Sequence, residues 1–143
     1  MENRYTAAVI TVSDKGFAGL REDTSGPALV KLLREDGYEV IRTSLVPDDM
    51  EKIMTELTIC ADRLSPCLIV TTGGTGFSPR DCMPEATLAV ADRLVPGIAE
   101  AMRAYSMKIT PRAMLSRATS VICRSTLIIN LPGSPKAVGE TLE

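Results

Sequence analysis

The sequence VTTGGTGFSPRD, residues 70–81, leads from an apolar segment through a glycine-rich turn to a proline, an arginine and an aspartate. The apolar run CLIVTT at 67–72 predicts a strand buried on both faces, and PEATLAVADRL at 84–94 predicts a helix. A strand, a glycine turn and a helix in this order are typical of α/β proteins. The turn can aim several backbone N–H groups at an anion, or it can be a tight connection that binds nothing.

The same alternation of strand and helix patterns runs along the rest of the chain. Strands are predicted at 6–12, 38–46, 67–72, 119–124 and 126–132. Helices are predicted at 23–37, 47–64, 84–94, 96–107 and from about residue 134 onward. The last two strands are close enough to pair as an antiparallel hairpin. We expect one domain, residues 1–143, that folds as a three-layer α/β/α sandwich around a mostly parallel sheet with one antiparallel strand.

Composition and charge narrow the classes of function. The 143 residues include 45% apolar and 24% charged residues and carry a net charge of −2, as in an ordinary globular protein. There is no basic field for general nucleic-acid binding, so we expect no nucleic-acid partner. No apolar stretch approaches the roughly 20 residues that span a bilayer, and the N-terminus predicts a strand rather than a signal peptide. We therefore expect a cytoplasmic protein without a membrane partner.

The residue types that are missing also limit the chemistry. The sequence has no histidine, which excludes Ser-His-Asp and Cys-His mechanisms. None of the cysteines at 60, 67, 82 and 123 forms a CxxC pair, so a zinc site is not expected. Each cysteine lies in or beside an apolar run, and we expect small buried side chains in a reducing compartment.

Ligands of open α/β sheets bind at the carboxyl ends of the strands. The loops predicted at that rim are 13–19, 47–49, 73–82 and 132–136. Asp48 and Asp81 fall on this rim, and two carboxylates beside a phosphate-binding loop indicate a Mg²⁺ site. The competing interpretation of Asp48 is a favourable charge at the start of a helix. The lysine of a P-loop is absent, so Arg80, or Lys15 and Lys136 from other loops, would have to supply positive charge.

Two later segments are further candidates for contacts with a ligand. Ser116 and Arg117, in MLSRA at 114–118, precede the predicted hairpin. Arg117 is either a bidentate phosphate ligand or a solvated surface side chain. The segment NLPGSPK at 130–136 either lets a base or phosphate approach or forms a rigid turn. The residues alone therefore predict an α/β domain that binds a nucleotide or phosphate.

Seven motifs taken together resemble one known family. They are TVSD (11–14), VPDD (46–49), TTGGTGFSPRD (71–81), MPEAT (83–87), PGIAEAMR (96–103), MLSRA (114–118) and INLPGSP (129–135). In this order and spacing they are similar to the molybdopterin-binding domain family. Within it, the resemblance is to the molybdopterin adenylyltransferases of the MogA and MoaB type and to the G domain of gephyrin, and it runs from about Thr6 to the C-terminus.

The resemblance implies a reaction, a metal and an assembly. In this family ATP and molybdopterin react to give adenylylated molybdopterin and pyrophosphate, in preparation for metal insertion by a separate enzyme of the molybdenum cofactor pathway. The terminal phosphate of molybdopterin would attack the α-phosphorus of ATP with Mg²⁺ as cofactor. That nucleophile is already an anion, which agrees with a site that has no histidine. The family also implies a homotrimer, or a hexamer built from two trimers.

The resemblance also assigns roles to residues by their position in the motifs. Asp48 and Asp81 would be the catalytic residues and the magnesium ligands. Phosphate would be held by the segment around the glycines, namely Thr72, Gly73, Gly74, Thr75, Gly76 and Arg80. The floor of the site would be lined by Ser13 and Asp14, and the pterin phosphate side by Ser116 and Arg117. Contacts on the nucleotide side would come from Pro132, Gly133, Ser134 and Pro135.

Two other functions remain open at this stage. One is a non-catalytic carrier or scaffold that keeps affinity for molybdopterin or a nucleotide. The other is a nucleotide-directed activity like that of the competence-damage-protein domain, which shares the fold. The presence of both Asp48 and Asp81 favours the enzyme, and the MLSRA and INLPGSP motifs favour the adenylyltransferase branch. Relatives carry the last helix several turns further than this chain, so either the chain is shortened or a neighbour closes that face of the sheet.

Overall fold

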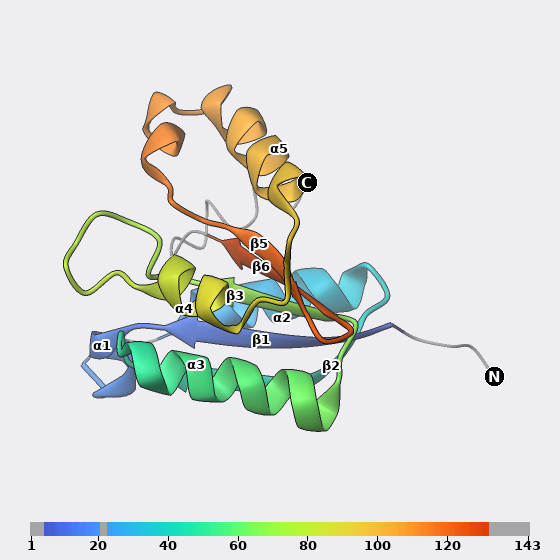
Figure 1. Ribbon diagram of the computed structural model, residues 1–143. Helices are drawn as coiled ribbons and strands as arrows, with labels where there is room; N and C mark the ends of the chain where they lie inside the picture. Colours follow the sequence, from blue (N-terminus) through green and yellow to red (C-terminus); the bar gives the residue numbers. More distant parts are fainter. Residues whose placement is uncertain (1–4, 21–22, 132–143) are drawn as a thin grey trace.

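The computed structural model describes residues 5–20 and 23–131, and its centre is a sheet of six strands in the order β2-β1-β3-β6-β5-β4 (Figure 1). The strands are β1 (Thr6–Val12), β2 (Glu39–Val46), β3 (Leu68–Thr72), β4 (Arg93–Leu94), β5 (Ser120–Cys123) and β6 (Thr126–Leu131). Segment 132–136 and the last predicted helix lie outside the described residues. The hairpin predicted from the two late strands is confirmed as β5 and β6.

The direction of the strands confirms the predicted sheet. Strand β1 pairs in parallel with β2 and β3, and β3 pairs in parallel with β6. Strand β5 is antiparallel to β6 on one side and to β4 on the other, so β5 alone runs against the rest. The central strands β1 and β3 carry no charged residue and are almost completely buried, as expected for strands covered on both faces.

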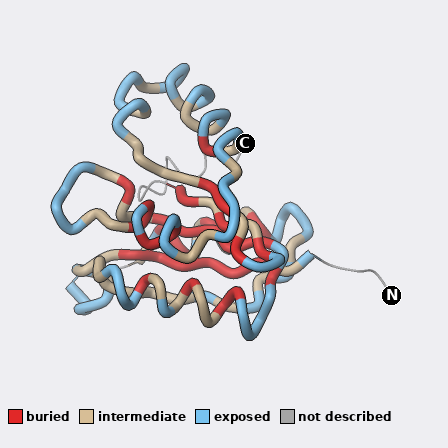
Figure 2. The backbone as a smooth tube through the Cα atoms, viewed as in Figure 1, coloured by how far each residue is buried: buried red, intermediate tan, exposed pale blue. Residues whose placement is uncertain are grey.

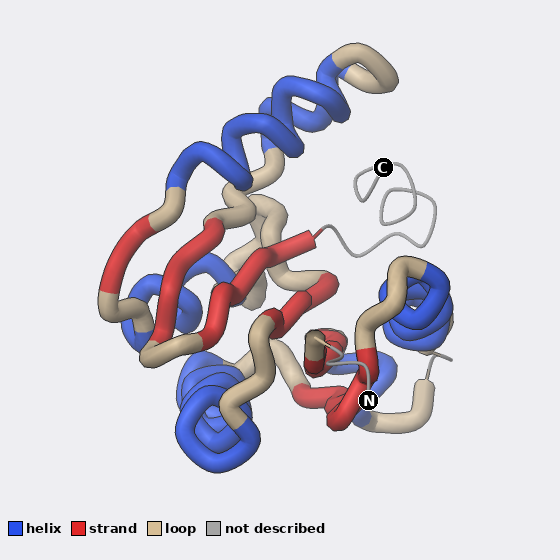
Figure 3. The backbone as a smooth tube through the Cα atoms, turned by 90° about the vertical axis from the view of Figure 1, so that its right-hand side faces the viewer, coloured by secondary structure: helices blue, strands red, loops and turns tan. Residues whose placement is uncertain are grey.

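Helices cover both faces of the sheet and complete the predicted three layers (Figure 3). The α-helices are α1 (Asp14–Phe17), α2 (Ser25–Glu35), α3 (Met50–Ile59), α4 (Met83–Val90) and α5 (Pro96–Met107). A π-helical turn, Cys60–Leu64, extends α3, and a 3₁₀ helix, Pro111–Leu115, follows α5. One core lies between the sheet and α3 with α4, and the other lies between the sheet and α2 with α5. Buried residues accordingly concentrate in the strands (Figure 2). Among the described residues, no helix has the length and apolar character needed to cross a membrane.

The sequence pattern missed strand β4. The helix predicted at 84–94 ends at Val90, because Ala91 is extended and the chain turns into the sheet edge. The N–H of Asp92 donates to Ile122 O at 2.8 Å, and the N–H of Val95 donates to Ser120 O at 2.9 Å. Two strand residues are too few to produce a periodic signal, so the pairing with β5 overrides the helical pattern there.

The cysteines follow the expectation only in part. All four are free thiols, and Cys60 and Cys123 are buried as predicted. Cys67 is exposed just before β3, and Cys82 is half-buried just before α4, so the prediction of buried cysteines was wrong for Cys67.

Gly73 places the glycine loop against the end of β1. From β1 the chain moves to β2 on one side, whereas after β3 it moves to β4, β5 and β6 on the other side, so the crevice of this sheet lies between β1 and β3. Gly73 follows β3 with φ +95°, and a Cβ there would lie 2.4 Å from Val12 O. Its N–H donates to Leu131 O at 3.2 Å. Only glycine lets the loop cross the end of β1 so closely.

We predict that Gly73→Ala destabilises the protein much more than Gly37→Ala. Gly37 has a similar φ of +92°, but a Cβ there would have nothing within 4 Å among the described residues. Gly37→Ala should therefore cost only the backbone strain, about 1–2 kcal/mol. Gly73→Ala should add an overpacking cost of about 1–3 kcal/mol. Urea unfolding measures both, and equal losses would contradict the close approach as the reason for glycine at 73.

Candidate active site

Two aspartates join the ends of β1 and β2 at the rim. The N–H of Asp14 donates to Asp48 Oδ2 at 3.1 Å, and the N–H of Asp48 donates to Asp14 Oδ1 at 3.0 Å. Just before Asp14, Ser13 caps α1 by accepting the N–H of Gly16 and donates its own N–H to Val46 O at 3.0 Å. The two predicted floor residues thus fix the relative position of two rim loops. Ser13 contributes to this through its backbone N–H, while its side chain caps α1.

The second carboxylate oxygen of Asp48 is buried without a partner. Asp48 Oδ1 is the one buried side-chain oxygen or nitrogen that has no hydrogen bond among the described residues. Burial raises the pKa of Asp48 above its ordinary value, and the hydrogen bond from Asp14 N–H only partly opposes this. The charges of Asp14 and Asp81 raise the pKa further. A buried carboxylate oxygen without a donor is costly for the folded protein and is available to a ligand or cation.

The neighbouring Asp49 shows which aspartate serves the helix. Asp49 Oδ1 accepts the N–H of Lys52 at 3.1 Å and caps α3. The interpretation of the pair as helix-start charges therefore holds for Asp49, whereas Asp48 turns toward the crevice beside Gly74.

The glycine loop presents a row of unpaired N–H groups. Among the described residues, the backbone N–H groups of Gly74, Thr75, Gly76 and Phe77 have no hydrogen-bond acceptor. Gly74 has φ +72°, and a Cβ there would lie 3.4 Å from Asp48 Oδ1. Successive unpaired N–H groups in a glycine-rich turn after a strand can receive an anion.

Asp81 folds back over this loop. Its Oδ2 accepts the N–H of Ser78 at 3.0 Å, and the same oxygen would lie 2.8 Å from a Cβ at Gly76. The two predicted metal ligands therefore both lie against the glycine loop, Asp48 beside Gly74 and Asp81 beside Gly76. The described residues hold no group of three or more His, Cys, Asp or Glu that could bind a metal by themselves. Two carboxylates with one unpaired oxygen fit Mg²⁺ only together with phosphate oxygens and water, which is the usual way this ion binds.

The guanidinium of Arg80 forms an ion pair with the carboxylate of Asp14. Its Nε donates to Asp14 Oδ2 and its Nη2 to Asp14 Oδ1, both at 2.9 Å. This hydrogen-bonded pair lowers the pKa of Asp14, and it bridges the loop after β1 to the loop after β3. Arg80 thus lies at the rim as the sequence predicts, but its guanidinium is paired with a protein carboxylate.

Arg117 is engaged with the glycine loop from the other side. Its backbone N–H donates to Thr75 O at 3.0 Å, and its Nε donates to Gly76 O at 2.7 Å. Its Nη2 donates to Asp81 O at 2.9 Å, and its Nη1 pairs with Glu85 at 2.6 Å. The sequence offered a phosphate ligand or a solvated arginine, and in this structure the guanidinium is hydrogen-bonded to the glycine loop and to Glu85.

A cavity of about 320 Å³ lies beside the loop, between it, α5 and the 3₁₀ helix. Its described polar side chains are those of Thr75, Arg103, Ser106, Thr110, Arg112, Ser116 and Asn130, and Gly76 also lines it. Of the residues that line it, the sequence analysis named Thr75, Gly76 and Ser116 but not the two arginines or Asn130, although Arg103 and Asn130 lie inside the motifs PGIAEAMR and INLPGSP. Arg103 Nη1 donates to the carbonyls of Ser116 and Ala118, at 3.2 and 2.8 Å.

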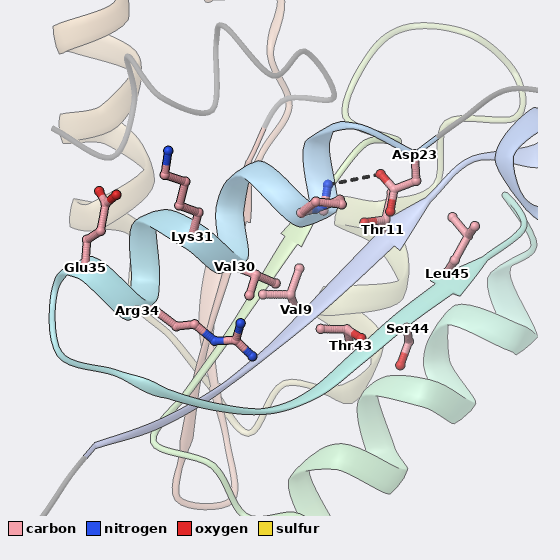
Figure 4. Close-up of a pocket in the computed structure, with 12 residues that line it drawn as sticks. Val9, Thr11, Asp23, Val30, Lys31, Arg34, Glu35, Thr43, Ser44 and Leu45 are labelled. Atoms are coloured by element: carbon pink, nitrogen blue, oxygen red, sulfur yellow. Dashed lines mark hydrogen bonds between the residues drawn. The ribbon is translucent and has the colours of Figure 1, made fainter.

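The larger cavity of the protein, about 730 Å³, lies elsewhere, between α2 and strands β1 and β2 (Figure 4). Arg34 extends from α2 toward the strands, whereas Lys31 and Glu35 point the other way. Asp23 accepts the N–H of Gly26 at 3.0 Å and is occupied in capping α2. Within residues 5–20 and 23–131, no predicted site residue lines this cavity, and none of its lining residues has an unpaired buried oxygen comparable to that of Asp48.

The structure brings most of the predicted site residues together. The set around the crevice comprises Ser13, Asp14, Asp48, Gly73, Gly74, Thr75, Gly76, Arg80 and Asp81. Thr72 is fully buried at the end of β3, beneath the loop. Ser116 and Arg117 lie on the cavity side of the loop, and the predicted contacts at 132–135 lie outside the described residues.

Comparison with known proteins agrees with this geometry. Residues 8–143 match the family model described as a probable molybdopterin binding domain. The chain is 43% identical to the molybdopterin adenylyltransferase of Escherichia coli over 99% of its own length and 73% of that protein. It is 40% identical to gephyrin of Dictyostelium discoideum over 99% of its length, which is 21% of gephyrin.

Among solved structures, the molybdopterin biosynthesis enzyme MoaB of Thermus thermophilus superposes with a TM-score of 0.92 at 47% identity, covering 97% of this chain and 87% of that one. With the sheet order, the crevice loops and these likenesses in agreement, the chain belongs to the molybdopterin-binding domain family.

Proposed function

We propose that this protein transfers AMP from ATP to the terminal phosphate of molybdopterin and releases pyrophosphate, as a step of molybdenum cofactor biosynthesis. One observation carries the proposal. The unpaired N–H groups of the loop begin at Gly74, which lies against the unpaired buried oxygen of Asp48. Anion donors and a cation acceptor side by side suit a phosphate chain that arrives with a divalent cation.

The N–H groups of the loop would hold the phosphates of ATP. Asp48 and Asp81 would hold Mg²⁺ between the protein and those phosphates, and the ion would neutralise charge on the leaving pyrophosphate. In the step itself, an oxygen of the molybdopterin phosphate bonds to the α-phosphorus while the bond from that phosphorus to the β-phosphate oxygen breaks. The nucleophile is already an anion, so the site needs positioning and charge stabilisation rather than a general base.

Molybdopterin would occupy the 320 Å³ cavity on the other side of the loop. Thr75 belongs to the glycine loop and also lines the cavity, so a pterin bound there would lie next to the phosphates of ATP. Among the described residues, the cations that line this cavity are Arg103 and Arg112, and they would bind the negatively charged pterin phosphate. We further propose that residues 1–143 act as one domain in a cytoplasmic homotrimer or hexamer, and that the metal-insertion enzyme consumes the product.

We predict that Asp81→Asn lowers pterin-dependent pyrophosphate release by at least about 100-fold, the usual effect of losing a charge-stabilising group. An asparagine keeps an acceptor for Ser78 N–H, so the loop should stay folded. Release is measured from ATP and Mg²⁺ with and without molybdopterin, together with the mass of the adduct. The control is Asp62→Asn, which removes a partner of Arg124 away from the crevice. Near-normal turnover by Asp81→Asn would contradict the magnesium assignment, and tight pterin binding without release by the wild type would favour a carrier.

We predict that Asp48→Asn makes the protein more stable while it removes activity. The raised pKa of Asp48 means that its ionised form destabilises the fold; the penalty is present above that pKa and is lost as the pH falls through it toward 3.8. Because the side chain is only partly buried, the gain should stay within about 1 kcal/mol, or roughly 2–4 °C in melting temperature at pH 7.

Asp14→Asn is the matched control for this stability measurement. The pKa of Asp14 is lowered by Arg80, so its contribution is stabilising above its ordinary pKa of 3.8 and is lost as the pH falls. Its substitution should lower the melting temperature at pH 7 and have less effect in high salt. A loss of stability in Asp48→Asn at pH 7 would show that Asp48 has a donor in solution.

We predict that Arg112→Ala weakens molybdopterin binding about tenfold, the factor expected from one charge-assisted hydrogen bond. Lys108→Ala is the control, because Lys108 is an exposed cation of the same segment that does not line the cavity. Binding is followed by titration in the absence of ATP. Equal affinities of the two variants would remove Arg112 from the pterin phosphate.

A further inference from the structure

Arg117 contacts the glycine loop at both of its ends. Its backbone N–H and its Nε bind successive carbonyls, those of Thr75 and Gly76, at 3.0 and 2.7 Å. Its Nη2 binds the carbonyl of Asp81, at 2.9 Å, where the loop returns to α4. No lysine could replace this pattern, because the planar guanidinium presents its donors in a fixed fork.

These contacts decide which way the loop N–H groups point. In a planar trans peptide the C=O of one residue and the N–H of the next point to opposite sides. When the carbonyls of Thr75 and Gly76 face Arg117, the N–H groups of Gly76 and Phe77 face away from it. These two belong to the N–H groups that have no acceptor among the described residues.

Glu85 holds the guanidinium in this position and neutralises it. Glu85 Oε2 lies 2.6 Å from Arg117 Nη1 and comes from the first turn of α4. Nε, Nη1 and Nη2 each already donate a hydrogen bond, and only a third of the side chain is exposed. A phosphate would have to compete with a carboxylate and two carbonyls for this charge.

We propose that Arg117 is a positioning residue that holds the glycine loop in its anion-binding conformation and does not itself bind phosphate. This inference rests on the proposed function, because it presumes that the loop receives the phosphates of ATP. Arg117 keeps the unpaired N–H groups directed at the crevice before ATP arrives, so that ATP binding does not have to reorganise the loop.

Hydrogen exchange of the ligand-free protein tests the role of Arg117 directly. In the peptide 73–83 five backbone amides have acceptors, those of Gly73, Ser78, Arg80, Asp81 and Met83. In Arg117→Lys and Arg117→Met their exchange should rise at least about tenfold, the factor that loss of one charge-assisted hydrogen bond produces. Glu85→Gln keeps the bonds to the two carbonyls and should change exchange by less than about threefold. Arg124→Lys is the control, since Arg124 pairs with Asp62 and Asp92 away from the loop.

Enzyme kinetics distinguishes a positioning role of Arg117 from a purely structural one, because the two roles differ in their effect on the KM for ATP relative to kcat. If ATP must first select the ordered loop, its apparent KM should rise about tenfold in Arg117→Lys, while kcat at saturating ATP should fall by less than about threefold. Saturating ATP with Mg²⁺ should also return the exchange of 73–83 to near the wild-type rate. The melting temperature of Arg117→Lys measures global stability and separates general unfolding from loosening of this loop.

The two measurements distinguish failure of this inference from failure of the proposed function. Wild-type exchange of 73–83 in ligand-free Arg117→Lys and Arg117→Met would overturn the positioning role, and a large loss of kcat with such exchange would make Arg117 a ligand of the reacting phosphates. Wild-type protein that neither binds ATP nor releases pyrophosphate would overturn the proposed function, and with it the anion-binding role that Arg117 is said to support.

Discussion

The contact between Gly73 and the end of β1 is the constraint on which the site depends. With a Cβ position 2.4 Å from Val12 O, the chain after β3 has no space for a side chain and must cross the crevice directly above β1. The N–H of Gly73 is bound to Leu131 O, so the same residue ties the loop to β6 as well. From this fixed start the next residues bring their N–H groups beside Asp48, which arrives from β2. The crevice is therefore assembled by backbone packing, and side chains are added to a loop that already has its position.

Asp48 shows what the site costs the fold. One of its oxygens is fully used by the N–H of Asp14, and the other is buried without a donor. A protein selected only for stability would place asparagine or a hydrogen-bonded group there, since an unpaired buried charge is unfavourable. The adjacent Asp49, which caps α3 in the ordinary way, shows that a satisfied arrangement was accessible one residue further on. Retained instability of this kind is typical of a site that is completed by a ligand.

Sequence patterns predicted the central architecture because it depends on local periodicity. The first and last residues of strand β1 were predicted correctly. The order of strands and helices led to the correct layers and to the one antiparallel strand. Strand β4 could not be predicted, because its two residues are strand only through β5, which lies far along the chain. The rim loops at 13–19, 47–49 and 73–82 were predicted by the rule for parallel sheets, but the contacts of the individual residues within them were not. Nothing local distinguishes Asp48 from Asp49, or shows that the donors of Arg117 meet the carbonyls of the glycine loop.

The distribution of charge explains how such a site works without the lysine of a P-loop. Arg80 is neutralised by Asp14, and Arg117 is neutralised by Glu85, so neither arginine offers a free cation at the crevice. What remains toward the crevice is a set of backbone N–H dipoles and two carboxylates. Asp48 and Asp81 would repel a bare polyphosphate. If the polyphosphate carries a divalent cation, the backbone N–H groups complement its oxygens and the two carboxylates complement the cation. The arginines around the glycine loop then act on its shape, and the proposed site would select a metal-bound nucleotide because the cation offsets the charge of the two carboxylates.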